Sequence, residues 1–165
     1  MCGIVGGFWS TPPVDLKKRM ESALEAMHNR GPDDRGFELR CEVGGLIALG
    51  HTRLSIIDLS MAGHQPMLSK CQRYAIVFNG EIYNYRELRT QLREVGHAFA
   101  TDSDTEVLLT AWIVWGRDCL RRLEGMFAFV IHDRAEHSMF CARDGFGIKP
   151  FFYTRSGDGF LFASS

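Results

Sequence analysis

Short apolar segments bounded by turn residues are the feature that most constrains the fold of this chain. The runs at 125–133 and 138–144, for example, are rich in aromatic and β-branched residues and are separated by only a few polar residues. Connections this short join antiparallel strands, because parallel strands need a long crossover. We expect strands at residues 1–10, 37–43, 46–57, 73–80, 125–133, 138–144, 150–154 and 159–164.

Three longer segments have the spacing of amphipathic helices. Between residues 14 and 28, Leu16, Met20 and Leu24 lie on one face, while lysines and glutamates occupy the other. Helices placed between groups of hairpin strands are typical of the α+β class, in which helices cover antiparallel sheet. The length of 165 residues suits one domain. We expect the helices at residues 14–28, 83–96 and 101–116.

Composition excludes several classes of function. The chain has 19 basic and 20 acidic residues, so neither nucleic acid nor an anionic membrane is a favoured partner. No apolar run approaches the ~20 residues of a membrane span, and no secretory signal precedes the first strand, which predicts a cytoplasmic protein. Five widely spaced cysteines suggest neither a disulfide framework nor a zinc site, and no metal ligands are predicted.

Cys2 is the first candidate for chemistry. If Met1 is removed, Cys2 carries a thiol and a free α-amine, and the amine can act as the general base for its own side chain. Both groups titrate within about two units of neutral pH. The alternatives are that Cys2 is an incidental small residue or a site of lipid attachment.

The pair Asn79–Gly80 allows two interpretations. It is typical of a tight hairpin turn, but a side-chain amide and a backbone N–H can also stabilise an oxyanion. Arg53 lies within an apolar run, so its guanidinium needs a carboxylate from the protein or from a ligand.

The acidic residues Asp102, Asp104 and Glu106 come at the predicted start of a helix. Ser103 and Glu106 fit a capping box, and Asp102 or Asp104 could cap instead. A carboxylate not used for capping could hold a substrate ammonium group. Together with Cys2, Arg53 and Asn79, these residues indicate a ligand with a carboxylate, an ammonium and an acyl carbon, which describes an amino acid with a side-chain amide.

A series of motifs carries a family resemblance along the whole chain. They are "MCGI", "NRGPDD", "HTRLSIIDLS", "HQPM", "FNGEIYNYREL", "TDSDTEVLL", "LEGMFAFVIHD", "RDGFGIKPFFY" and "FLFAS". In this order they resemble the class II glutamine amidotransferase domain of the N-terminal-nucleophile (Ntn) hydrolases, and most of all the glutaminase half of glutamine-hydrolysing asparagine synthetases. The residue Asn29 departs from the family, whose members often have histidine there, and this weakens asparagine as the product.

The resemblance implies a fold and a set of site residues. The fold would be a four-layer αββα sandwich of two antiparallel sheets between helices. Cys2 would be the nucleophile, and Asn79 and Gly80 the oxyanion hole. Arg53 would bind the glutamine carboxylate, and Asp104 with the main chain around Glu81 would bind its ammonium. The glutamine pocket would be lined by main-chain groups of Leu54, Ser55, Ile56 and Ile57.

The same resemblance implies an activity and its partners. Residues 1–165 would hydrolyse L-glutamine to glutamate and ammonia without a cofactor. ATP and Mg²⁺ would serve only a C-terminal synthetase domain, which this chain lacks. We expect a fragment of a longer enzyme rather than a standalone glutaminase, and a homodimer is the further assembly we consider. The alternatives are a relative that amidates another carboxylate, as in cell-surface sugar or natural-product biosynthesis, and a silent glutamine-binding module.

Overall fold

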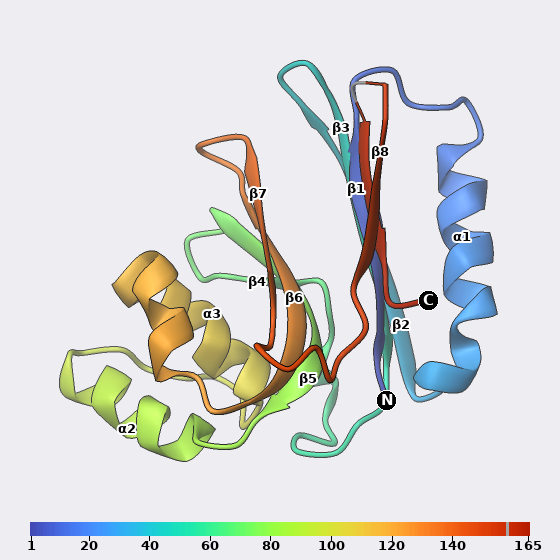
Figure 1. Cartoon of the computed structure of the whole chain (residues 1–165). Helices are drawn as coiled ribbons and strands as arrows, with labels where there is room; N and C mark the ends of the chain where they lie inside the picture. Colours follow the sequence, from blue (N-terminus) through green and yellow to red (C-terminus); the bar gives the residue numbers. More distant parts are fainter. Residues whose placement is uncertain (158) are drawn as a thin grey trace.

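Two antiparallel β-sheets stack face to face at the centre of this computed structural model, which describes residues 1–157 and 159–165 (Figure 1). The first sheet has the strand order β2-β3-β1-β9-β8, and the second has the order β4-β5-β6-β7. The first contains β1 (Gly3–Trp9), β2 (Asp34–Glu42), β3 (Gly45–Arg53), β8 (Phe152–Ser156) and β9 (Gly159–Ala163). The second contains β4 (Met67–Leu68), β5 (Tyr74–Ile82), β6 (Gly125–Asp133) and β7 (Ser138–Arg143).

Helices cover both outer faces of the stack. Helix α1 (Leu16–Ala26) packs on the first sheet, and α2 (Tyr85–Glu94) and α3 (Asp104–Trp115) pack on the second (Figure 1). The expected four-layer αββα sandwich is therefore confirmed. The remaining elements are the short 3₁₀ helices η1 (His28–Arg30), η2 (Met61–Gly63) and η3 (Gly116–Arg122). No helix in the described residues is long and apolar enough to cross a membrane.

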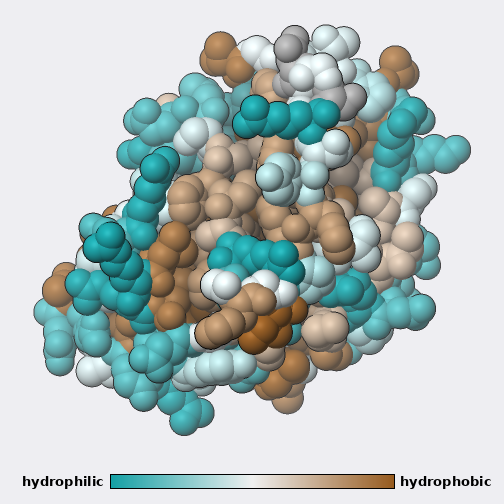
Figure 2. All heavy atoms as spheres, in the orientation of Figure 1, coloured by the Kyte–Doolittle hydropathy of each residue, from teal (hydrophilic) through white to brown (hydrophobic). Residues whose placement is uncertain are grey.

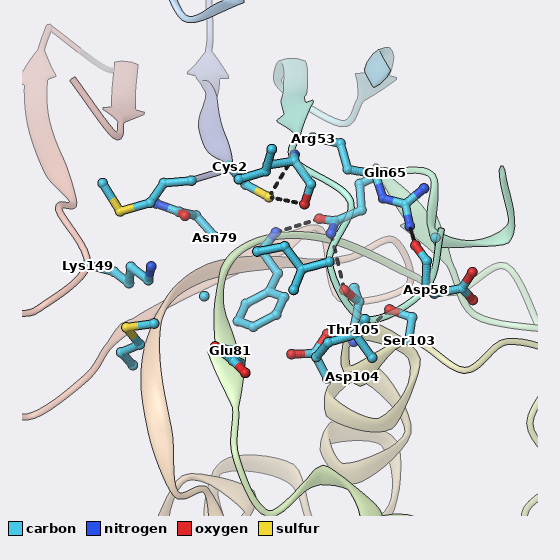
Figure 3. Close-up of a pocket in the computed structure, with 18 residues that line it drawn as sticks. Cys2, Arg53, Asp58, Gln65, Asn79, Glu81, Ser103, Asp104, Thr105 and Lys149 are labelled. Atoms are coloured by element: carbon cyan, nitrogen blue, oxygen red, sulfur yellow. Dashed lines mark hydrogen bonds between the residues drawn. The ribbon is translucent and has the colours of Figure 1, made fainter. Parts of the chain in front are cut away.

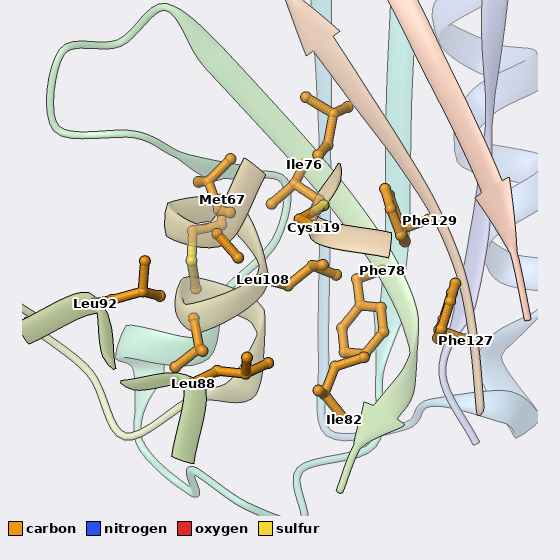
Figure 4. Close-up of a cluster of buried hydrophobic side chains, with 14 residues drawn as sticks. Met67, Ile76, Phe78, Ile82, Leu88, Leu92, Leu108, Cys119, Phe127 and Phe129 are labelled. Atoms are coloured by element: carbon orange, nitrogen blue, oxygen red, sulfur yellow. The ribbon is translucent and has the colours of Figure 1, made fainter. Parts of the chain in front are cut away.

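Alternation along the central strands explains the layers. In β5, Ile76 and Phe78 face the helices, while Ala75 and Val77 face the first sheet. Both faces of β5 and β6 are buried, so these strands read as nearly continuous apolar runs. Figure 4 shows the larger cluster between the second sheet and its helices, where Leu88, Leu92 and Leu108 contact the row from β5. On the face drawn in Figure 2, apolar side chains gather between the two sheets and hydrophilic ones form the edges.

The ends of two strands near the cavity differ from the expectation in a way that bears on the site. The strand expected at 46–57 ends at Arg53, so the next four residues form a loop. The strand expected at 73–80 continues to Ile82, which means that Asn79–Gly80 is not a hairpin turn. The pair lies opposite Ala128 and Phe127 of β6, and this pairing outweighs the local preference of Asn-Gly for a turn. The turn interpretation was wrong for this reason.

Candidate active site

A cavity of about 160 Å³ opens at the end of the stack where β1 begins. Cys2 lies at one wall, and β5, the loop after β3 and the start of α3 form the others (Figure 3). Of the residues predicted for the site, the cavity is lined by Cys2, Arg53, Leu54, Ile56, Ile57, Asn79, Gly80, Glu81 and Asp104. Ser55 is not among the lining residues, and its N–H donates to Asp33 Oδ2 at 2.7 Å.

The Cys2 thiol is held against the backbone of Leu54. The N–H of Leu54 donates to Cys2 Sγ at 3.4 Å, and the thiol lies 3.7 Å from the Leu54 carbonyl oxygen, to which it donates. Burial raises the pKa of the Cys2 thiol, although the Leu54 contact, the terminal amine and Lys149 each act to lower it. Because the thiol form is favoured at neutral pH, attack by Cys2 requires a nearby base.

The segment that follows α1 fixes the backbone around Cys2. Arg30 Nε donates to the Cys2 carbonyl oxygen at 3.2 Å. Gly31 lies so close to β3 that a Cβ atom there would come within 2.5 Å of the Arg53 backbone nitrogen. The segment therefore supports Cys2 and the end of β3 together.

The edge of β5 presents a row of N–H groups to the cavity. In an antiparallel strand every second residue points its N–H to the same side. The N–H of Phe78 donates to Gln65 Oε1 at 2.7 Å, and that of Ile82 donates to Asp104 Oδ2 at 3.1 Å. Gly80 lies between Phe78 and Ile82, opposite Phe127 of β6. The N–H and the carbonyl oxygen of Phe127 both bond to Asp144, on the side of β6 away from β5. The N–H of Gly80 therefore does not bond to β6 and points to the same side as those of Phe78 and Ile82. The Gly80 N–H is thus directed at the cavity.

The side chain of Asn79 points to the face of β5 that is opposite the helices. It continues the row of Ala75 and Val77 that faces the first sheet, and only 1% of its surface is exposed. Its Nδ2 donates to Ser164 Oγ at 3.4 Å, while its Oδ1 is buried and has no hydrogen-bond partner among residues 1–157 and 159–165. A buried amide with unused hydrogen-bonding capacity beside a cavity is suited to bind a polar group there.

Arg53 binds the loop that follows β3. Its Nη1 donates to the Ser60 carbonyl oxygen at 2.7 Å, and its Nη2 donates to the Asp58 carbonyl oxygen. Among the described ion pairs none involves Arg53, so the prediction of a protein carboxylate partner is not supported. Two carbonyl contacts leave part of its five-donor guanidinium for an anion in the cavity.

Asp104 is a buried carboxylate at the first turn of α3. Burial raises its pKa to about 6, and the nearby Glu81 acts in the same direction. Ser103 is the N-cap, as predicted, and its Oγ accepts from the Thr105 N–H at 3.0 Å. The reciprocal half of the capping box is absent from the described contacts, because Glu106 instead accepts from Ala100 and Thr101. Asp104 is therefore not needed as a cap.

A family model described as "Glutamine amidotransferase domain" matches residues 1–165. The chain belongs to this family. The match covers the whole chain, including Cys2 and the residues of the cavity. The resemblance to class II glutamine amidotransferases is confirmed.

The relatives of this amidotransferase domain are much longer than the chain. It is 42% identical to "Asparagine synthetase [glutamine-hydrolyzing] 3" of Bacillus subtilis, covering 99% of this chain and 26% of that protein. It is 38% identical to "Amidase chry2" of Gibberella zeae, over 93% and 24%. The chain thus spans about a quarter of the length of these relatives. A solved glutamine phosphoribosylpyrophosphate amidotransferase from B. subtilis matches with a TM-score of 0.78 and 24% identity, over 98% of this chain and 41% of that one.

Several residues around the amidotransferase cavity were not predicted individually. Gln65 holds the Phe78 N–H, Arg30 holds Cys2, and Lys149, 5% exposed, lies at the cavity wall (Figure 3). The motifs "NRGPDD", "HQPM" and "RDGFGIKPFFY" contain three of these residues, so the signal for them was present as motif membership. Their contacts join segments far apart in the sequence, and no local pattern indicates such contacts.

Proposed function

We propose that residues 1–165 form a glutaminase unit that hydrolyses the side-chain amide of L-glutamine to glutamate and ammonia. The observation that carries this proposal is the row of N–H groups on β5: two are occupied by Gln65 and Asp104, and the one between them, from Gly80, is directed at the cavity beside Cys2. Such a donor is what an oxyanion formed at Cys2 requires.

Two charged groups orient the substrate in this proposal. Arg53 binds the α-carboxylate of glutamine with donors that the loop carbonyls leave free. Asp104, with Glu81 beside it, binds the α-ammonium. The backbone of Leu54, Ile56 and Ile57 lines the side chain, and the amide carbon then lies at Cys2. Fixing both charged groups on Cα holds the side-chain amide at Cys2, so attack becomes an effectively unimolecular step.

Cys2 acts as an N-terminal nucleophile after removal of Met1. The α-amine accepts the thiol proton as Sγ attacks the amide carbon, and the negative charge forms on the amide oxygen. Asn79 and the Gly80 N–H stabilise that oxyanion. The protonated amine returns its proton to the leaving nitrogen, so that ammonia departs and a γ-glutamyl thioester remains. The amine then removes a proton from water, which cleaves the thioester to glutamate and restores the thiol.

Glutamate release by the purified protein tests the nucleophile. Cys2→Ala should abolish it, and Cys71→Ala, an exposed cysteine outside the cavity, should leave it unchanged. Activity that survives in the Cys2 variant would remove the assignment.

Arg53→Ala should raise the KM for glutamine about 100-fold if a charge-assisted hydrogen bond of about 3 kcal/mol is lost. Mass spectrometry should find Cys2 as the first residue of the active protein.

The acceptor of the ammonia is a second part of the proposal. The relatives named asparagine synthetases support aspartate as the acceptor. We expect a synthetase unit outside this chain to use ATP and Mg²⁺ for this amidation in the cytoplasm. The glutaminase unit itself needs no cofactor. The relative named an amidase supports another acceptor. ATP-dependent asparagine formation by the full-length enzyme separates the two. A protein that binds glutamine but releases no glutamate would instead be a silent binding module.

A further inference from the structure

Ser164 connects the strand of Cys2 to the side chain of Asn79. It follows β9 and is 1% exposed. Its N–H donates to the Ile4 carbonyl oxygen at 2.9 Å, and its Oγ accepts from the Ile4 N–H at 3.0 Å. The same Oγ lies 3.4 Å from Asn79 Nδ2. One hydroxyl thus contacts β1 two residues after Cys2 and the amide on β5.

The hydrogen-bonding capacity of these groups identifies the competent orientation of the amide. A serine hydroxyl has one proton to donate, whereas both of its described partners here, the Ile4 N–H and Asn79 Nδ2, are donors. Asn79 Oδ1 is meanwhile buried and has no partner in the part of the chain that the structure describes. If the amide turns over by 180°, the hydroxyl donates to Oδ1 and still accepts from the Ile4 N–H, and the NH₂ group is left free for a ligand oxygen.

We propose that Ser164 is a positioning residue for the oxyanion hole. This proposal rests on the glutaminase function proposed above. Ser164 donates its hydroxyl proton to Asn79 Oδ1 and thereby turns the Asn79 NH₂ group toward the developing oxyanion. The backbone of Asn79 is already fixed by pairing with Ala128 of β6, so rotation of the amide is the freedom that remains. The Ile4 N–H donates to one lone pair of the hydroxyl and does not use its proton, which stays available for Asn79.

A double-mutant cycle tests this role. Asn79→Ala should lower kcat about 10²–10³-fold, the usual cost of one oxyanion donor. Ser164→Ala should lower kcat at least tenfold with little change in KM, and Ser164→Thr should restore most of it. In the Asn79→Ala background, Ser164→Ala should cost nothing further, because its effect passes through Asn79. Independent effects that multiply would overturn the proposal.

Ser69→Ala is the matched control for loss of structure. Ser69 is 6% exposed, and its Oγ accepts from the N–H of Tyr74 at the start of β5, so the variant removes the same kind of bond far from the cavity. Its kcat should equal that of the wild type. A fall in kcat equal to that of Ser164→Ala would mean that Ser164 is only structural.

A second measurement does not depend on turnover. A suitable probe is a glutamine analogue with a chloromethyl ketone in place of the amide. Cys2 Sγ attacks the chloromethyl carbon of the analogue, and chloride leaves together with the thiol proton. The carbonyl oxygen of the analogue occupies the oxyanion site. Mass spectrometry should show at least tenfold slower labelling in Ser164→Ala and no change in Ser69→Ala. Equal rates in these two variants would overturn the role of Ser164. Labelling of a wild type that releases no glutamate would refute only the proposed hydrolysis, and a wild type that is not labelled would refute both.

Discussion

Replacing Asp104 by asparagine should stabilise the fold above pH 7 while removing glutamine binding. The carboxylate is 6% exposed, and burial raises its pKa to about 6 from the usual 3.8. The Ile82 N–H, together with the N–H groups of Asp104 and Thr105, opposes this rise but does not cancel it. The folded protein therefore carries a cost for the charge that a neutral amide of the same shape avoids.

The sign of the effect follows from proton binding. Between pH 3.8 and about 6 the folded state holds more protons than the unfolded state, so the contribution of Asp104 to stability falls as pH rises through its folded pKa. At about 1.4 kcal/mol per pKa unit, the cost above pH 7 is about 3 kcal/mol. The amide oxygen of asparagine is a weaker acceptor than the carboxylate for the surrounding N–H donors, which costs about 1 kcal/mol. The net gain is about 2 kcal/mol.

Urea unfolding of wild type and Asp104→Asn from pH 4 to pH 8 measures this difference. The free energy of unfolding should be nearly equal or slightly lower for the variant at pH 4, and higher by about 2 kcal/mol at pH 8. A difference between Asp104→Asn and wild type that does not change with pH would refute the assignment of a buried, charged Asp104. Glutamine should protect the wild type but not the variant.

Substitutions at Gly63 and at Asp58 give two further predictions. A Cβ atom at Gly63 would lie 2.0 Å from Arg53 Nη2, so Gly63→Ala should displace the guanidinium and raise the glutamine KM about tenfold, or about 1.4 kcal/mol. Steady-state kinetics check this, with Gly145→Ala, where a Cβ meets open space, expected to match wild type. Asp58 accepts from the Asp102 N–H at 3.1 Å, so Asp58→Ala should free the loop from the segment that precedes α3 and speed proteolysis between residues 54 and 63. Unchanged cleavage there would contradict the link.

The layers of the fold could be predicted because they depend on local patterns. The strand expected at 125–133 is β6, and the three helices lie within their expected ranges. The end of β5 could not be predicted, because Asn79–Gly80 has a strong local preference for a turn. Its extended conformation depends on pairing with β6 and on the bond between Ile82 and Asp104, and both partners are distant in the sequence.

The charged and nucleophilic residues that line the candidate site could be predicted from the sequence, but the groups that hold them could not. Cys2, Arg53 and Asp104 are unusual where they occur, and this is visible without coordinates. Gln65 lies in a stretch with only loop character, and its role depends on reaching the Phe78 N–H. Ser164 is one serine among several, and only its contacts with Ile4 and Asn79 distinguish it.

The buried polar groups of the cavity explain why glutamine would be selected. Asp104 carries a desolvated charge. This charge destabilises the empty site, and a ligand gains affinity only if it supplies the missing positive group. A simple amide would occupy the oxyanion hole but leave Asp104 unpaired, whereas glutamate would satisfy Asp104 and Arg53 but place a negative charge beside the Cys2 thiol. In the proposed function, glutamine would pair with both Asp104 and Arg53 and would present a neutral, cleavable amide to Cys2.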